Sequence, residues 1–245
     1  MRDFAVFLSL FVLAVGTIGW AQAPFETDTI KTSSGDLQIT FIGHASLAFR
    51  YGNLVVYVDP VSQYADFAAL VKADLVLVTH EHSDHLDPKA IQALRGEKTI
   101  VVGTAKCAPQ VPGMVTMTNG DSRTVQGLRI EAVPAYNIVN KRPTGEPFHA
   151  KGDGNGYVIA FGDKRVYVAG DTENTAEMKT QKNIDVAFLP MNLPYTMTPE
   201  MVAEAAKAFA PKILYPYHYG STDTSQLTKL LAGTPGIEVR IRNMK

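Results

Sequence analysis

Alternating and continuous apolar stretches define the first strands of the chain. Residues 37–42 alternate apolar and polar side chains, which is typical of a strand with one buried face. Two short apolar stretches, 47–51 and 54–58, follow it with a Gly-Asn turn signal between them. The run 74–78 is almost wholly apolar and favours a buried strand. This part is predicted to begin as a meander of strands, and the polar residues 27–35 before it are expected to form a loose lead-in.

Strands and helices alternate after this point. A helix is expected at 88–94, a second after the capping residue Thr198 with Pro211 stopping it, and a third at 227–231. Further strands are expected at 99–102, 114–117, 123–125, 128–133, 157–161, 165–169, 184–189, 213–217 and 237–241. The pattern predicts one α/β domain built as two sheet layers between helices.

The first 23 residues do not belong to this pattern. An Arg at position 2 precedes an almost unbroken apolar run at 4–15, and Ala21-Gln22-Ala23 is a small-x-small cleavage site, as in secretory signal peptides. The alternative is a retained anchor, but the run is short for a membrane span, which needs about 20 residues. We expect a signal peptide at 1–23, a mature domain at 24–245 without stable membrane insertion, and a periplasmic or secreted protein.

Composition narrows the classes of partner. Hydrophobic residues make up 46% of the chain and charged residues 19%, as in an ordinary globular protein. The formal net charge of −1 argues against a nucleic-acid partner bound by a basic surface, and a small-molecule substrate is expected instead. The single cysteine, Cys107, is expected to be a small buried residue. The oligomeric state is left open.

The stretch from Thr79 to Asp87 contains the candidate chemistry. It holds His80, His82, Asp84 and His85, although the whole chain has only six histidines. The stretch follows the buried run 74–78 and precedes the predicted helix, so it forms a loop at the end of a strand, where α/β proteins commonly bind ligands. Imidazole and carboxylate groups are good ligands for zinc and similar divalent metals. His80 and His82 can face one metal ion while Asp84 and His85 reach a second.

The run His80-x-His82-x-Asp84-His85 resembles the signature of the metallo-β-lactamase fold superfamily, whose members hydrolyse many different substrates. The resemblance implies an α/β fold in the form of a four-layer αβ/βα sandwich, with two mixed sheets between helices. It also implies three further metal ligands downstream, which are a histidine, an aspartate and a final histidine.

Two of these ligands have clear counterparts in the chain. Gly170-Asp171-Thr172 is similar to the family's Gly-Asp-Thr ligand, so Asp171 is expected to bridge two metal ions with its two oxygens. His218 follows the predicted strand 213–217 and is positioned like the final histidine.

The remaining histidine has two possible positions. In several branches it directly follows a Pro-Ala pair, where this chain has Asn137. Another branch has Pro-Ala-Tyr-Asn and later Phe-His, which is similar to residues 134–137 and to Phe148-His149 here. We therefore expect His149 to be the ligand. The alternative is that Asn137 or water fills the place and His149 is a loop residue.

The resemblance thus implies a site with two divalent metal ions, most simply zinc, with manganese or iron fitting nearly as well. His80, His82 and His149 would hold one ion, Asp84, His85 and His218 the other, and Asp171 would lie between them. His44, in Gly43-His44-Ala45-Ser46, is similar to a histidine near the site in phospholipase- and lactonase-like branches. It is expected to support the site or face the substrate, and the alternative is a structural histidine.

Such a site predicts a metal-dependent hydrolase. Two cations about 3.5–4 Å apart lower the pKa of a water between them, so that a hydroxide is present near neutral pH. Asp84 is the candidate to orient this nucleophile and pass a proton. The resemblance favours an ester, lactone or phosphodiester substrate. A di-iron redox enzyme and a non-catalytic metal-binding protein are the alternatives.

The polar connection 137–155 is long for a compact domain, and such loops are usually functional or disordered. It is a candidate pocket wall, together with the aromatic residues Tyr195, Tyr217 and Tyr219. The alternative for these tyrosines is half-buried packing.

Overall fold

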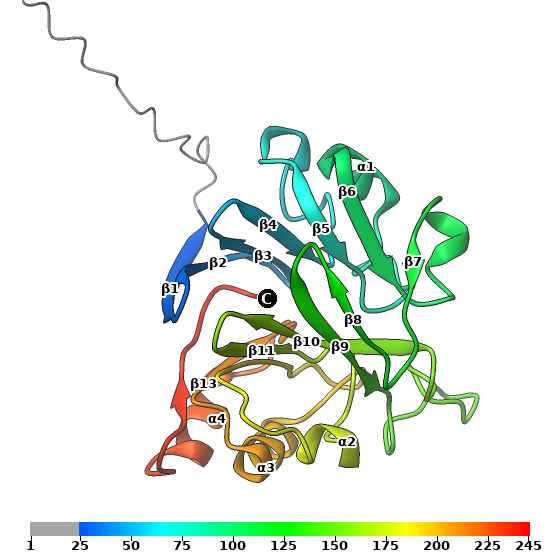
Figure 1. The fold of residues 1–245 in the computed structure, drawn as a ribbon. Coiled ribbons are helices and arrows are strands. Elements are labelled where there is room, and N and C mark those ends of the chain that lie inside the picture. Colours follow the sequence, from blue (N-terminus) through cyan, green and yellow to red (C-terminus); the bar gives the residue numbers. More distant parts are fainter. Residues whose placement is uncertain (1–24) are drawn as a thin grey trace, which may run out of the picture.

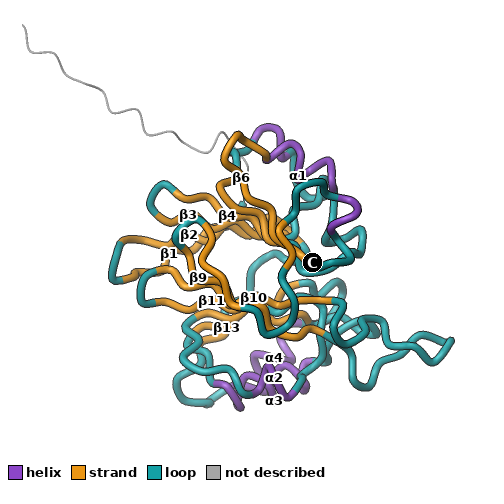
Figure 2. Tube along the Cα trace, turned by 45° about the vertical axis from the view of Figure 1, so that its right-hand side comes forward, coloured by secondary structure: helices purple, strands orange, loops and turns teal. Residues whose placement is uncertain are grey.

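Two seven-stranded sheets face each other in the structure, a computed structural model that describes residues 25–245. The expected signal segment, 1–23, lies outside the described residues. Figure 1 shows the two sheets stacked one above the other, and Figure 2 shows that helices lie on the outer sides of this pair. The predicted four-layer arrangement is therefore confirmed.

The first sheet has the strand order β1-β2-β3-β4-β5-β6-β7. Its strands are β1 (Glu26–Thr32), β2 (Gly35–Gly43), β3 (Ser46–Tyr51), β4 (Leu54–Val58), β5 (Ala73–Leu77), β6 (Arg95–Gly103) and β7 (Val115–Thr116). Pairing is antiparallel from β1 to β4 and parallel from β4 to β7. Short turns suffice for the antiparallel part, whereas the parallel part needs crossover connections, one of which contains α1 (Pro88–Leu94).

The second sheet has the order β14-β13-β12-β11-β10-β9-β8 and the same division. Its strands are β8 (Ser122–Val125), β9 (Leu128–Ala135), β10 (Gly154–Phe161), β11 (Lys164–Val168), β12 (Val186–Pro190), β13 (Ile213–Tyr217) and β14 (Glu238–Val239). The crossovers of its parallel part contain α2 (Ala176–Lys179), α3 (Pro199–Phe209) and α4 (Thr224–Leu231). The side chain of Thr198 caps α3 by accepting a hydrogen bond from the backbone N–H of Met201.

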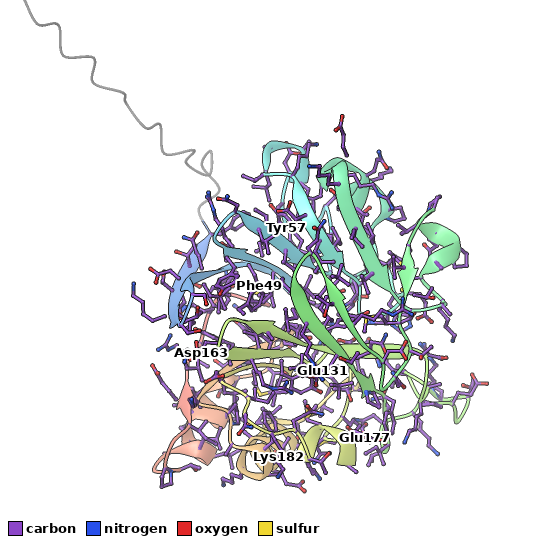
Figure 3. The ribbon with its side chains drawn as sticks, in the orientation of Figure 1. Phe49, Tyr57, Glu131, Asp163, Glu177 and Lys182 are labelled. Atoms are coloured by element: carbon purple, nitrogen blue, oxygen red, sulfur yellow. The ribbon has the colours of Figure 1, made fainter. Side chains whose placement is uncertain are left out.

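The apolar core lies in layers that correspond to the sequence pattern. Phe49 of β3 is buried between the sheets, where its ring centroid is 5.6 Å from that of Phe161 in β10. Tyr57 of β4 is buried on the outer face of the first sheet, which α1 covers. Figure 3 labels Phe49 and Tyr57 on these two faces. Central strands such as β12 are buried on both faces because each sheet is covered on both sides.

The prediction for the start of the domain is wrong. Residues 27–35 include most of strand β1, which pairs with β2 from Glu26 opposite Phe41 to Thr32 opposite Gly35. This edge strand buries only Ile30 of its side chains, so it lacks the apolar alternation that marks other strands. Two smaller differences are α2, which the pattern did not predict, and β14, which is shorter than the expected strand 237–241.

The long connection between β9 and β10 folds back on itself, with an isolated bridge pairing Lys141 with Pro147. In Figure 1 this connection projects from the right-hand side of the molecule. Of the helices in the described part, none is long and apolar enough to cross a membrane.

Candidate metal centre

The ends of several strands carry the predicted site residues to one edge of the two sheets. The motif loop 79–87 follows β5, Asp171 follows β11, and His218 follows β13. The carboxyl ends of β5, β11 and β13 lie at the same edge. The two sheets are joined there by the backbone N–H of Asn155, at the start of β10, which donates to the carbonyl of Thr79 after β5. All seven predicted ligands are brought together there: His80, His82, Asp84, His85, His149, Asp171 and His218.

A glycine makes the close approach of Asp171 possible. Gly170 has a φ of +66°, a conformation that residues with a side chain rarely adopt. A Cβ atom at this position would also lie 2.9 Å from the carbonyl oxygen of Asn155. The backbone can therefore turn directly after β11 and direct the Asp171 carboxylate into the cluster.

Three imidazoles form the first group of the cluster. The Nδ1 atom of His82 lies 3.1 Å from Nε2 of His80 and 3.1 Å from Nε2 of His149. Ligand nitrogens around a tetrahedral zinc, at roughly 2.0–2.1 Å from the ion, are about 3.3 Å apart. The spacing of these nitrogens therefore fits a shared cation.

The second group lies beside the first and shares Asp171 with it. Oδ1 of Asp171 is 3.3 Å from Nε2 of His85, and Oδ2 is 3.4 Å from Nε2 of His218. The same Oδ2 is 3.3 Å from Nε2 of His149 in the first group. Oδ2 of Asp84 lies 3.5 Å from Nε2 of His218. The carboxylate of Asp171 thus lies between the two groups, as a bridging ligand would.

Several buried polar atoms of the cluster lack a hydrogen-bond partner. Among residues 25–245 these include Nε2 of His85, Oδ1 of Asp171 and both ring nitrogens of His218. Buried polar atoms are nearly always satisfied, and leaving one without a partner costs about 1–3 kcal/mol. Metal ions bound by these atoms would remove that cost, so the donor set fits a divalent metal centre.

The electrostatics of the cluster also suit metal ions. Burial lowers the pKa of His149 to about 4 and holds the pKa of His80 well below its usual range, so both rings are neutral. Burial would raise the pKa of Asp171, but the nearby His218 and His85 outweigh it and hold that pKa well below normal. Neutral imidazoles and an ionised carboxylate are the forms that bind metals.

The pKa of His85 is raised, unlike those of His80 and His149. Burial would lower its pKa, but the charges of Asp171 and Asp59 outweigh burial and raise it. The pKa of Asp84 is held below its usual range, since contacts with His218 and His44 outweigh the effect of burial. The carboxylates therefore attract positive charge to this part of the cluster.

Asp59 is a residue that the sequence reasoning missed. It is fully buried, and its Oδ2 lies 2.8 Å from Nδ1 of His85. It also accepts hydrogen bonds from the backbone N–H of Thr79 at 2.8 Å and from the Thr79 hydroxyl at 2.7 Å. An acceptor at Nδ1 directs the lone pair at Nε2 of His85 into the cluster. The available signal was its position directly after β4, the neighbour of β5.

Asn137 and His149 lie side by side. Oδ1 of Asn137 accepts from the backbone N–H of His149 at 2.8 Å and lies 2.8 Å from its Nδ1. The Asn137 amide nitrogen donates to Glu173 and to the carbonyl of Tyr195. Asn137 therefore orients the His149 ring, and it is His149 that reaches the cluster.

His44 lies against the second group. Its Nε2 is 3.3 Å from Oδ2 of Asp84, and its Nδ1 is 3.3 Å from the carbonyl oxygen of Lys245. Its ring centroid is 3.8 Å from that of His218, and it stacks on Tyr64 at 5.4 Å. His44 therefore lies beside the second group, and its supporting or substrate-facing role stays a prediction.

The cluster opens into a hollow with a volume of about 280 Å³. Its wall contains His44, His82, Ser83, Asp84, Arg142, Phe148, His149, Asp171, Asn192, Tyr195 and His218. Of the tyrosines considered above, Tyr195 lines the hollow, whereas Tyr217 and Tyr219 are buried packing residues. Cys107 is buried away from this wall, as expected.

Comparisons with known proteins agree with this site. Residues 38–218 match the model of the β-lactamase superfamily domain. A UPF0173 metal-dependent hydrolase from Pelotomaculum thermopropionicum is 30% identical over 84% of this chain and 96% of its own. A crystal structure from Parabacteroides distasonis, described as a metal-dependent hydrolase, is 48% identical, with a TM-score of 0.86 over 90% of this chain and 100% of its own.

The fold alone is also similar to YhfI of Bacillus subtilis, a metallo-β-lactamase fold protein. YhfI is 16% identical, with a TM-score of 0.65 over 85% of this chain and 96% of its own. The family match, the identity to the hydrolases and the histidine–aspartate cluster agree with one another. The chain therefore belongs to the β-lactamase superfamily and is a metal-dependent hydrolase of the metallo-β-lactamase fold.

Proposed function

We propose that the protein hydrolyses an ester, lactone or phosphodiester bond in a small molecule, with two divalent metal ions, most simply zinc. The observation that carries this proposal is the carboxylate of Asp171, which approaches His149 of one group and His85 and His218 of the other. In this proposal His80, His82 and His149 hold one ion, Asp84, His85 and His218 hold the other, and Asp171 is shared.

When bound, the ions would lower the pKa of a water and withdraw electrons from the oxygen of the bond to be cleaved. The residues of the chain orient the reactants. Asp84, whose carboxylate lines the hollow, accepts a hydrogen bond from the attacking water and passes on its proton. His44 holds that carboxylate through its Nε2 atom, which lies 3.3 Å from Oδ2 of Asp84. Asn192, which also lines the hollow, offers an amide to the substrate.

The hollow supports a small substrate. Its volume of about 280 Å³ is near the lower limit of ligand pockets, which span about 300–1,000 Å³. The sequence has no Gly-x-Ser-x-Gly nucleophile pattern, and the hollow is lined by metal-binding side chains. Activation of water by metal therefore explains the site better than a covalent intermediate on the protein.

The test combines metal analysis with a hydrolysis panel. The purified protein is assayed on a 4-nitrophenyl ester, a lactone and a bis(4-nitrophenyl) phosphate, before and after chelation. We expect activity on at least one class, its loss on chelation, and its return with zinc. His82→Ala should lose metal and lower kcat/KM by at least about 100-fold, because its ring lies between His80 and His149.

The exposed Asp36→Asn variant is the matched control and should keep full activity. Full turnover by metal-free protein would contradict the proposal. Bound iron with consumption of oxygen, and no hydrolysis, would favour a redox enzyme on the same fold. Bound zinc without turnover on any of the three classes would exclude the proposed substrates.

We also propose that this activity is located outside the cytoplasm. The support is the apolar run 4–15 and the cleavage site Ala21-Gln22-Ala23 in the sequence. N-terminal sequencing of the protein from a periplasmic fraction should begin at Pro24. An uncleaved protein in the cytoplasmic fraction would contradict this location.

A further inference from the structure

Arg142 is a cation at the mouth of the site. It lines the hollow above the cluster and also a second hollow, about 350 Å³ in volume, on the other side of His82 and Phe148. The two hollows share His82, Arg142, Phe148 and His149. The Arg142 side chain therefore lies next to the proposed reaction site.

The hairpin that carries Arg142 is held by its own backbone. The N–H of Arg142 donates to the carbonyl of Glu146 at 2.7 Å, and the N–H of Gly145 donates to the carbonyl of Arg142 at 2.8 Å. Gly145 has a φ of +90°, which a tight turn requires and glycine allows. The two arms are joined where Lys141 pairs with Pro147. The position of Arg142 is thus fixed relative to the residues that follow the turn.

Those residues are Phe148 and the predicted ligand His149. Cζ of Arg142 lies 5.1 Å from the centroid of the Phe148 ring, within the range of a cation–π contact. Phe148 in turn packs edge-on against Tyr195, with ring centroids 5.1 Å apart. The guanidinium is therefore pre-positioned beside an aromatic wall of the hollow, which lowers the entropy lost when it binds a ligand.

Arg142 has no carboxylate partner within residues 25–245. Two other cations of this region are paired, Lys106 with Asp153 at 2.5 Å and Lys151 with Glu177 at 2.7 Å. The one hydrogen bond of the Arg142 side chain is a long contact of 3.4 Å to the carbonyl of Phe148. Most of its five N–H donors are therefore free to bind an acceptor from solution.

The surrounding charges indicate which side an anion would use. The second hollow contains three acids, Glu81, Glu146 and Asp153, and besides Arg142 only one lining cation, Lys106, so its excess of negative charge would repel an anion. In the first hollow the acids are Asp84 and Asp171, which belong to the metal cluster, so bound metal ions would neutralise them. The first hollow is therefore the side on which Arg142 can hold an anionic group.

We propose that Arg142 determines substrate specificity by binding a carboxylate or phosphate group attached to the molecule that is hydrolysed. This inference rests on the proposed hydrolase function and adds the substrate class, an anionic ester or lactone whose carbon frame lies against Phe148 and Tyr195. The planar guanidinium binds such groups through two parallel hydrogen bonds.

The test uses a matched set of esters. These are mono(4-nitrophenyl) glutarate, its phosphonate counterpart 4-nitrophenyl 4-phosphonobutanoate, and the neutral 4-nitrophenyl pentanoate of the same length. We expect the wild type to prefer an anionic ester by about 10–100-fold in kcat/KM, mainly through KM, because one charged hydrogen-bonding pair is gained. Arg142→Gln should reduce that preference to less than about 3-fold and leave the neutral ester unchanged.

Lys141→Gln is the control, since Lys141 is an exposed neighbour that lines neither hollow, and it should keep the preference. The comparison of the two anionic esters decides between carboxylate and phosphate recognition. An equal ratio in wild type and Arg142→Gln, or an equal loss on charged and neutral esters, would overturn the proposal.

A binding measurement separates this proposal from the hydrolase function. Calorimetry with the metal-loaded protein compares glutarate with pentanoate, which differ by one carboxylate. We expect glutarate to bind the wild type at least about 10-fold more tightly, and Arg142→Gln to lose that difference. If no ester is hydrolysed but this difference is found, the proposed reaction fails and the anion site stands; if the difference is absent, the anion site fails.

Discussion

Single residues outside the metal-binding set determine how the ligands of this site are oriented. Asp59 fixes His85 and the backbone of Thr79 at the start of the motif loop. Asn137 does the same for His149. Such supporting residues typically change metal affinity by about 10–100-fold, because a ligand ring that can rotate binds less well.

Replacing Asp59 by Asn tests this role. Asp59 has a φ of +45°, a conformation that Asn tolerates, so the variant should fold normally. Loss of the negative charge next to His85 should weaken zinc binding by about 10–100-fold. Competition with a chromogenic chelator measures the affinity, and circular dichroism checks the fold. Unchanged zinc affinity in a folded variant would show that His85 does not depend on Asp59.

Strands and site residues could be predicted from the sequence where a local pattern determines the structure. Three buried strands were predicted because each is a short apolar run followed by polar residues. These strands precede the motif loop, Asp171 and His218. The histidine spacing of the motif is also a local pattern. Strand β1 was missed because an edge strand with one buried side chain has no apolar pattern. Asp59 and Arg142 were missed because their roles depend on contacts with residues far away in the sequence.

At the scale of elements, one buried carboxylate organises the loop beside the cluster. Glu173, two residues after Asp171, accepts hydrogen bonds from the backbone N–H groups of Ile138, Val139 and Asn140 at 2.7–2.8 Å. Its side chain is fully buried. The loop that leads to His149 is therefore tied to the strand end that carries the shared aspartate.

Glu173→Gln should loosen this loop without unfolding the sheets. A neutral amide presents a donor where the N–H groups need acceptors, so the amides of residues 138–140 should exchange about 10–100-fold faster. Hydrogen exchange detected by mass spectrometry measures the change. Glu204→Gln, at an exposed ion pair with Lys179, is the control. Protection at 138–140 that equals the wild type would contradict the proposed anchor.

At the scale of the whole molecule, the first strand and the last residues of the chain are joined by one carboxylate. Asp28 of β1 accepts hydrogen bonds from Tyr215 of β13 and from Arg240 and Arg242. Burial would raise the pKa of Asp28, but Arg242, Tyr215 and Arg240 together outweigh it and lower that pKa. The contact therefore connects an edge of the first sheet to the second.

The lowered pKa of Asp28 predicts a pH dependence of stability. Its folded-state pKa lies below its unfolded value, so its contribution is complete above the unfolded pKa and is lost as pH falls through the folded pKa. Asp28→Asn should lower the free energy of unfolding by about 1–2 kcal/mol near neutral pH. Urea unfolding should show wild type and variant converging as pH falls below the folded-state pKa of Asp28.

The comparison needs a surface reference, which Asp36→Asn supplies. Asp36 pairs with Lys31 at an exposed position, so this change should cost less than about 0.5 kcal/mol at any pH. A loss in Asp28→Asn that persists undiminished in acid would mean that packing, and not the charge, is responsible.

Metal ions that bind groups from both sheets should stabilise the whole fold. A ligand present at about 100 times its Kd adds about 2.7 kcal/mol, which corresponds to about 5–10 °C in Tm for a chain of this size. Chelation should therefore lower the Tm by that amount, and zinc should restore it. Calorimetry measures the shift, and His82→Ala should show little of it. An identical Tm with and without zinc would indicate that the sheets close without the ions.

The hairpin from Lys141 to Pro147 has a consequence for how this enzyme can diverge over evolution. Six of the seven predicted ligands follow strand ends of the two sheets, and His149 follows the hairpin, so changes in either sheet would disrupt the chemistry. The hairpin itself contains none of the ligands, although its residue Arg142 lines the hollow beside them. A homologue can therefore replace Arg142 and acquire a different substrate specificity while it keeps the same metal ligands.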